Sequence, residues 1–210
     1  MDAGHITAGR IDDRSIVDVR PDDLAGYERV HFFAGIGGWD YALSLCGYAG
    51  PVWTGSCPCQ PFSSAARSRQ NRRQDVEQHL WPHWRRLIAE LSPIAIFGEQ
   101  TAQAGDWFDE VCNDMETMGY AIGASILPAC SLGYDHARSR LYFVCYSNGK
   151  SESELSINGE MAGMRQHKRN TTEVGRANGI SAPMGRLRAY GNAIVPQVAA
   201  EFIKAAMRCG

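Results

Sequence analysis

The residue best suited to covalent chemistry is Cys59, in the segment Cys57-Pro58-Cys59-Gln60-Pro61-Phe62-Ser63. A lone cysteine is more often a small buried side chain than a nucleophile. Here two prolines stiffen the backbone around the thiol, and a short β-like stretch precedes it. We therefore expect Cys59 to be held at the mouth of a sheet, in polar surroundings, where it would act as a nucleophile.

Three charged residues lie beside predicted strands. Glu99 follows the apolar strand 94–97, which places its carboxyl where α/β folds put their active sites. A carboxyl there can have a raised pKa and act as an acid, although a helix-capping or exposed glutamate explains the position equally well. Arg138 and Arg140 lead into another strand, and their spacing puts both on one face. A solvated edge is the alternative for these arginines.

A glycine-rich turn, Phe33-Ala34-Gly35-Ile36-Gly37-Gly38, follows a predicted strand over 30–33 and precedes a predicted helix over 39–46. Such a turn lets the backbone approach a ligand closely, at a helix N-terminus that favours polar or anionic groups. Glycines also serve in tight turns that bind nothing, so this motif alone does not decide between the two roles.

The predicted strands and helices that position these residues alternate along the chain. We predict further helices over 82–91, 106–118 and 196–207, with further strands over 94–97, 120–127 and 141–146. Alternation of this kind predicts an α/β, Rossmann-like fold, with a mostly parallel sheet, flanking helices and a ligand crevice at the carboxyl ends of the strands.

The 210 residues suffice for one compact domain. We assign residues 1–28 to a loosely tied N-terminal extension and residues 29–210 to the catalytic domain. Within that domain, residues 147–185 are rich in Ser, Asn, Gly and charge, which predicts a loop-like insertion.

Composition excludes several classes of protein. No stretch approaches the roughly 20 apolar residues of a membrane span, and the N-terminus lacks the apolar core of a signal peptide, so we expect an intracellular, cytoplasmic protein with no membrane partner. The seven cysteines show no paired framework and no zinc-ligand spacing, which predicts reduced thiols and no metal. Net charge is −2. Arg67, Arg69, Arg72 and Arg73 follow the Cys59 segment, and this neighbourhood favours phosphate contact over the alternative, a solvated loop.

Taken in order, these segments resemble the motifs of the DNA cytosine-C5 methyltransferases. The segment FAGIGG is similar to the first cofactor motif, and the resemblance implies cofactor contacts for Phe33, Gly35 and Gly37. The segment PCQPFS matches the catalytic motif and implies that Cys59 is the nucleophile. The segment FGEQT stands where the family has Glu-Asn-Val, which implies that Glu99 is the catalytic acid.

Two later segments extend the resemblance from about Val30 to the C-terminus. HARSR resembles Gln-x-Arg-x-Arg with His136 in place of Gln, and it implies base-binding and structural roles for Arg138 and Arg140. GNAIVPQVA is similar to the last motif and implies that Asn192 lies near the cofactor. The resemblance implies a reduced class I methyltransferase fold, S-adenosylmethionine as cofactor, and DNA whose target cytosine is flipped out or single-stranded.

Besides His136, the sequence departs from the family at three places. Gln100 and Thr101 differ from the Glu-Asn-Val motif. The interval 39–57 is too short for the two strands that carry the family's ribose-binding and adenine-binding acids, and Asp40 is its only acid. Only about fifty residues occupy the place of the target-recognition domain. We therefore expect short or weak sequence specificity, or recognition supplied by a partner protein or a second copy.

These departures leave the one-carbon donor open. Methylation from S-adenosylmethionine is the main expectation. The same thiol chemistry with methylenetetrahydrofolate would give 5-hydroxymethylcytosine, and a catalytically inactive DNA-binding remnant is the third alternative. A zinc deaminase lacks its Cys and His pattern here, and a nicotinamide dehydrogenase would not explain the Pro58-Cys59-Gln60 motif.

Overall fold

The computed structural model describes residues 7–58, 79–135, 138–148 and 194–209. Cys59, His136, Asn192, the four arginines at 67–73 and nearly all of the expected insertion lie outside the described residues.

Five strands form one sheet in the order β1-β2-β3-β5-β4. Their bounds are Arg29–Phe32 for β1, Val52–Gly55 for β2, Ala95–Thr101 for β3, Tyr120–Pro128 for β4 and Ser139–Ser147 for β5. The pairs β1–β2 and β2–β3 are parallel, whereas β5 runs antiparallel to both β3 and β4. Four strands therefore run in one direction, as the alternating pattern of strands and helices predicts.

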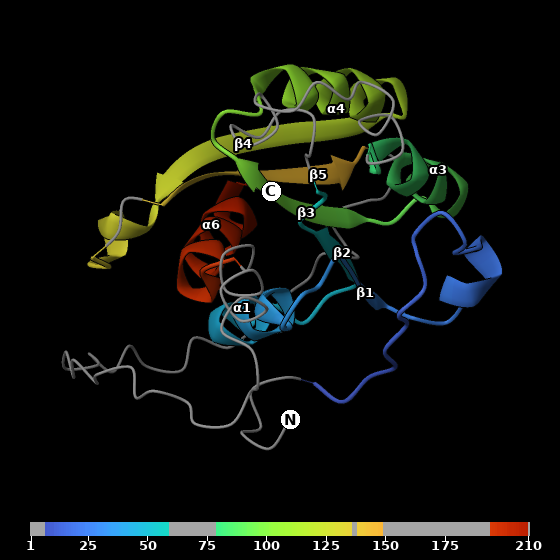
Figure 1. Ribbon diagram of the computed structural model, residues 1–210, viewed down its shortest axis with the longest axis horizontal. Coiled ribbons are helices and arrows are strands. Elements are labelled where there is room, and N and C mark those ends of the chain that lie inside the picture. Colours follow the sequence, from blue (N-terminus) through green and yellow to red (C-terminus); the bar gives the residue numbers. More distant parts are fainter. Residues whose placement is uncertain (1–6, 59–78, 136–137, 149–193, 210) are drawn as a thin grey trace, which may run out of the picture.

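Helices cover both faces of this sheet (Figure 1). One layer consists of α1 (Gly38–Cys46) and α6 (Pro196–Cys209), which pack against each other. The other consists of α3 (Trp81–Leu91) and α4 (Gly105–Thr117). Two short 3-10 helices complete the described elements: η1 (Pro21–Leu24) and η3 (Ala129–Leu132). These layers confirm the predicted α/β fold.

Local sequence explains the first helix. Gly37 precedes α1 with φ 82° and Gly47 follows it with φ 70°, backbone values that glycine adopts without steric cost. Between them Trp39, Ala42 and Leu43 recur at helical spacing and are at most 1% exposed.

Two hydrophobic clusters form the core, one on each face of the sheet. The cluster under α3 and α4 is built around Trp81, Trp84 and Trp107, with Trp81 in edge-on contact with each of the other two at 5.8 Å. The cluster under α1 and α6 includes Phe97 and Phe202, whose ring centroids lie 6.4 Å apart. Burial of each such aliphatic or aromatic side chain contributes about 1.5–3 kcal/mol.

Three local expectations are corrected. Glu99 lies inside β3 rather than after it, because β3 continues to Thr101 by pairing with β5. The helix expected over 106–118 spans Gly105–Thr117, with Ala104 directly before it. Ile16 and Val19, expected in a loosely tied extension, are 6% and 8% exposed and join the cluster under α3 and α4.

The short interval after the glycine turn is confirmed. Residues 39–57 are all described and hold α1 and β2 only, with no strand between them. In the described residues β1 pairs with β2 alone, so it forms one edge of the sheet.

Candidate active site

The candidate site is built around Glu99 in the middle of the sheet. Its side chain is only 6% exposed, and its Oε1 accepts a hydrogen bond from Nε of Arg140 at 2.9 Å. Arg140 lies on β5 opposite Thr101, and Tyr142 lies opposite Glu99, so the cross-strand register puts all of these side chains on one face. Strand pairing thus fixes the ion pair.

A second donor reaches Glu99 from the end of β2. The side chain of Ser56 is hydrogen-bonded to the Glu99 carboxyl, and the indole Nε1 of Trp39 donates to Ser56 Oγ at 3.2 Å. Ser56 follows the last residue of β2, Gly55, which pairs with Gly98 of β3. One hydroxyl therefore connects helix α1, directly after the glycine turn, to the candidate acid.

Burial and neighbouring charges act in opposite directions on Glu99. Burial raises the pKa of its carboxyl, while the Ser56 hydrogen bond and the charges of Arg140 and Arg138 lower it; the net shift is upward. Arg138 lies close enough to be affected in turn, since burial and Arg140 lower its pKa and Glu99 raises it. The predicted trio of Glu99, Arg138 and Arg140 is thus brought together in one place.

Tyr142 closes the side of the site nearest the C-terminal segment. Its ring makes an edge contact with Trp39 at 6.3 Å, and its hydroxyl is hydrogen-bonded to the backbone of Val195. Burial, and secondarily Glu99, raise the pKa of Tyr142, so the phenol stays neutral at physiological pH.

The side chain of Gln100 lies on the face of β3 opposite to that of Glu99. Its side chain is buried, its Nε2 donates to the carbonyl oxygen of Cys57 at 2.8 Å, and its Oε1 accepts from the backbone N–H of Thr101 at 2.8 Å. Glu99 and Gln100 are therefore adjacent in β3: Glu99 is the candidate acid, and Gln100 binds the chain that leads into the Cys59 segment. Cys59 itself is outside the described residues.

The glycine turn contains three residues with positive φ. Phe33, Gly35 and Gly37 have φ values of 53°, 54° and 82°, and a Cβ added to Gly35 would meet no atom of the described residues within 4 Å. A positive φ is rare for phenylalanine and marks local strain. Gly35 leaves open space in which a ligand could approach the backbone.

The C-terminal motif returns to this turn. A Cβ built on Gly38 would lie 2.8 Å from Cγ1 of Ile194, so only glycine permits the close packing there. Asn192 is outside the described residues, but Ile194, two residues later, packs directly beside the glycine turn. The two segments expected to bind the cofactor thus approach each other.

Asp40 is not placed to replace the absent ribose-binding acid. It is 5% exposed, its Oδ1 lies 3.7 Å from Nε2 of His31, and its Oδ2 accepts from the backbone N–H of Thr7. The other ring nitrogen of His31 is hydrogen-bonded to Thr54 at 2.7 Å. Asp40 is therefore engaged by β1 and the N-terminal stretch, and the described residues provide no adenosine anchor after β1.

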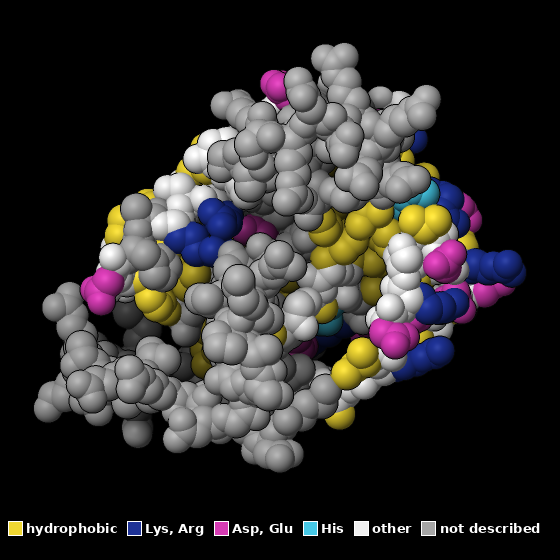
Figure 2. All heavy atoms as spheres, in the orientation of Figure 1, with side chains coloured by type: hydrophobic (Ala, Val, Ile, Leu, Met, Phe, Trp, Pro, Cys, Tyr) yellow, Lys and Arg dark blue, Asp and Glu magenta, His cyan; other side chains and the backbone are white. Residues whose placement is uncertain are grey.

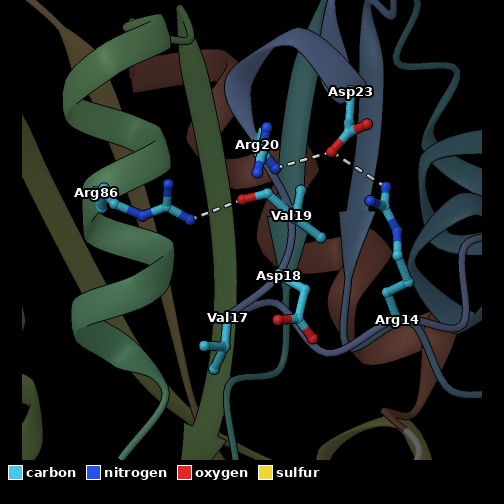
Figure 3. Close-up of a pocket in the computed structure, with 7 residues that line it drawn as sticks. All are labelled: Arg14, Val17, Asp18, Val19, Arg20, Asp23 and Arg86. Carbon is cyan, nitrogen blue, oxygen red and sulfur yellow. Dashed lines mark hydrogen bonds and ion pairs between the residues drawn. The ribbon is translucent and has the colours of Figure 1, made fainter.

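One cavity in the described part of the chain lies away from this chemistry. It has a volume of about 550 Å³ and is lined by Arg14, the stretch 17–20, Asp23 of η1 and Arg86 of α3. Figure 3 shows Arg86 donating to the Val19 carbonyl and Arg14 reaching Asp23, so these groups pair with one another. Charges of both signs also alternate over the right-hand part of Figure 2, where Figure 1 places η1 and α3. This cavity contains none of the predicted site residues.

Among the described residues, no group of His, Cys, Asp or Glu side chains is arranged to hold a metal. Within the same part of the chain, no helix is long and apolar enough to cross a bilayer.

Comparison with known proteins gives consistent matches. A family model described as C-5 cytosine-specific DNA methylase matches residues 51–182, more than half of the chain and a range that includes Cys59, Glu99, Arg138 and Arg140. The type II methyltransferase M.HhaI of Haemophilus parahaemolyticus is 23% identical over 175 residues, which cover 63% of this chain and 53% of M.HhaI. M1.HphI from the same organism is 27% identical over 103 residues, which cover 47% of this chain and 28% of M1.HphI.

One solved structure is similar over part of the chain. The Dnmt2 methyltransferase of S. pombe superimposes with a TM-score of 0.48 at 20% identity, over 59% of this chain and 52% of Dnmt2. The chain thus spans about half the length of M.HhaI and of this structural neighbour.

The site also contains residues that sequence reasoning missed. Ser56, Trp39 and Tyr142 surround Glu99, and no spacing rule distinguishes them from core residues. Gln100 was noted only as a departure from the family motif. The sequence feature that could have identified Gln100 is an amide after an apolar strand, because a buried polar group requires hydrogen-bond partners.

Proposed function

Because the chain belongs to the C-5 cytosine-specific DNA methylase family, we propose that it transfers a methyl group to C5 of cytosine in DNA. The observation that carries the proposal is the buried pair of Glu99 and Arg140, with Arg138 beside it. Glu99 lies on β3, the strand adjacent to β2, and the end of β2 leads into the Cys59 segment. A carboxyl and two guanidinium groups suit a polar ring that must be bound at several atoms.

In the proposed reaction the Cys59 thiolate adds to C6 of cytosine, forming a carbon–sulfur bond and an enamine whose C5 is nucleophilic. Glu99 gives a proton to N3 as electron density moves onto the ring, and an arginine at O2 stabilises the developing charge. After C5 has taken the methyl group its proton passes to water, the electron pair of that C–H bond re-forms the C5–C6 double bond and expels the Cys59 thiolate, and the proton at N3 returns to Glu99. Arg140 holds the Glu99 carboxylate between these two proton transfers.

S-adenosylmethionine is the donor that we propose, and it would supply an electrophilic methyl group. Phe33, Gly35 and Gly37 fit one end of it, since the open space at Gly35 admits a ligand against the backbone. The described residues do not fit the adenosine end, because Asp40 is occupied by His31 and Thr7. We therefore expect S-adenosylmethionine to bind weakly to the protein alone.

DNA is the proposed substrate, with the target base flipped out or single-stranded. Short or partner-supplied sequence recognition remains our expectation, because the insertion is far smaller than a recognition domain. A second copy of the chain or another protein would supply the contacts to base edges.

Covalent trapping tests the nucleophile and the acid. The full chain is incubated with 5-fluorocytosine DNA and donor, and a denaturation-resistant complex is expected, because the C5 fluorine cannot be removed as a proton. Cys59→Ala should abolish the complex and Glu99→Gln should slow its formation. Cys130→Ala removes an exposed free thiol and serves as the matched control. Equal trapping by Cys59→Ala and the control would refute the proposed nucleophile.

Mass spectrometry of the DNA nucleosides tests the donor. Methylation adds a CH2 unit to cytosine, and hydroxymethylation from methylenetetrahydrofolate adds a CH2O unit. A CH2 increment that requires S-adenosylmethionine supports the proposal. A CH2O increment would reassign the donor, and no increment with either donor would favour a DNA-binding protein without catalysis.

A further inference from the structure

The hydroxyl of Ser56 has a defined direction. The indole N–H of Trp39 can only donate, so in its 3.2 Å contact with Ser56 Oγ the serine oxygen must be the acceptor. Ser56 and Glu99 directly follow Gly55 and Gly98, which pair across the parallel strands β2 and β3, so the two residues are neighbours. The single proton of Ser56 is then free to donate to Glu99, with which Ser56 is hydrogen-bonded. Trp39 is 1% exposed and held in α1, so this arrangement rests on a rigid element.

The groups that face Glu99 come from three elements. Arg138 and Arg140 approach from the start of β5 and Tyr142 from its middle, while Ser56 approaches from the end of β2 and is held by Trp39 of α1. The arginines carry fixed charge at any physiological pH, and Tyr142 stays neutral. Ser56 is the one neutral hydroxyl donor among these described neighbours that is bonded to the carboxyl.

We propose that Ser56 is a positioning residue: its hydroxyl, oriented by Trp39, holds the Glu99 carboxyl in place beside Arg140. The inference rests on the proposed function, because it assigns Ser56 a part in the proton transfers of that reaction.

The role follows from the proton balance at Glu99. N3 of cytosine is an acceptor, so Glu99 must carry a proton when the base binds and become a carboxylate as that proton moves to N3. Burial alone would trap the carboxyl in its protonated form. Ser56 and Arg140 each donate to the carboxylate and offset that burial, so the charge formed during the reaction has donors already in position.

Two variants test the inference in the free protein. Glutamate is labelled with 13C at its carboxyl carbon, and the Glu99 signal is assigned by comparison with Glu99→Gln. Ser56→Ala should raise the pH midpoint of this signal by about one unit, a tenfold change in the ratio of protonated to ionised carboxyl. Ser56→Thr keeps a hydroxyl and should stay near the wild-type midpoint. An unchanged midpoint in Ser56→Ala, or the same rise in both variants, would overturn the inference.

The pH profile of covalent trapping tests the link to the reaction. Because Glu99 acts as the acid, the trapping rate should fall as pH rises through its pKa. In Ser56→Ala this decline should move to higher pH, and the maximal rate should fall about tenfold because the carboxylate loses a donor. A uniform loss with an unmoved profile would reduce Ser56 to a structural role and overturn the inference. Absence of trapping in the wild type, with the midpoint shift intact, would instead reject the proposed function.

Discussion

Nε of Arg140 donates to Oε1 of Glu99 at 2.9 Å, across two antiparallel strands of one sheet. The Glu99 side chain is 6% exposed and that of Arg140 is 20% exposed, so each group largely replaces the other's hydration. A pair of this kind responds asymmetrically to mutation, because removing one partner leaves the other buried and uncompensated.

Arg140→Met should therefore lower the free energy of unfolding by about 2 kcal/mol, the value of a hydrogen bond to a charged group. Arg140→Lys retains the charge but loses the directed Nε donor, so it should lose less. Urea unfolding followed by tryptophan fluorescence measures both. The double variant with Glu99→Gln should lose less than the sum of the two single variants; simple additivity would show that the pair is not coupled.

Gln100 should matter for both stability and trapping. Gln100→Leu removes the donor to the Cys57 carbonyl and the acceptor of the Thr101 N–H, and leaving buried groups unpaired costs about 1–3 kcal/mol. We expect lower stability in urea and slower trapping with unchanged DNA affinity. Gln103→Leu, at an exposed position in the turn that follows β3, is the matched control. Equal behaviour of the two variants would contradict a role for the Gln100 amide.

Sequence patterns predicted the fold because local and global signals agree. The run 94–97 is apolar and β3 is buried along nearly its whole length. In α3, Trp84, Leu87 and Ile88 recur at helical spacing and are fully buried. The glycines at 37 and 47 mark the bounds of α1 through their positive φ values. Such features depend on a few neighbouring residues, which is why the sequence alone identifies them.

The features that the sequence did not predict depend on contacts between segments that are distant along the chain. Glu99 was placed after its strand because periodicity cannot show that β5 extends the ladder to Thr101. The burial of Ile16 requires α3, which lies some seventy residues later. The role proposed for Ser56 depends on its contacts with Trp39 and Glu99, and the sequence, in which it is a serine before a cysteine, does not indicate these contacts.

Gly98 should not tolerate a side chain. A Cβ added there would lie 2.0 Å from Cζ of Phe143, far inside contact distance, and Phe143 is itself packed against Trp107. Gly98→Ala should lower the free energy of unfolding by about 1–3 kcal/mol through overpacking, and it should slow trapping by displacing the adjacent Glu99. Thermal unfolding measures the first effect.

Gly123→Ala provides the matched control for that substitution. Gly123 lies in the same sheet, on β4, but its added Cβ would make only an ordinary 3.8 Å contact with Val144. It should leave stability unchanged or slightly raised, because alanine restricts the unfolded chain. A loss at Gly123 as large as that at Gly98 would mean that strand glycines matter here for some reason other than the contact with Phe143.

His31 should make the protein less stable in mild acid. Burial lowers the pKa of His31, and this outweighs the opposing effect of Asp40, so the folded state binds the proton less readily than the unfolded chain does. The unfolding free energy should therefore be flat above about pH 7 and fall as pH drops below about 6.5, the pKa of an unperturbed histidine, by at most about 1.4 kcal/mol per pH unit. Urea titrations at a series of pH values from about 7.5 to about 5.0 measure this slope, because this range brackets the pKa of an unperturbed histidine. His31→Gln should retain a partner for Thr54 but lose its share of the slope. A wild type and variant with parallel curves would show that His31 is not protonated on unfolding in this range.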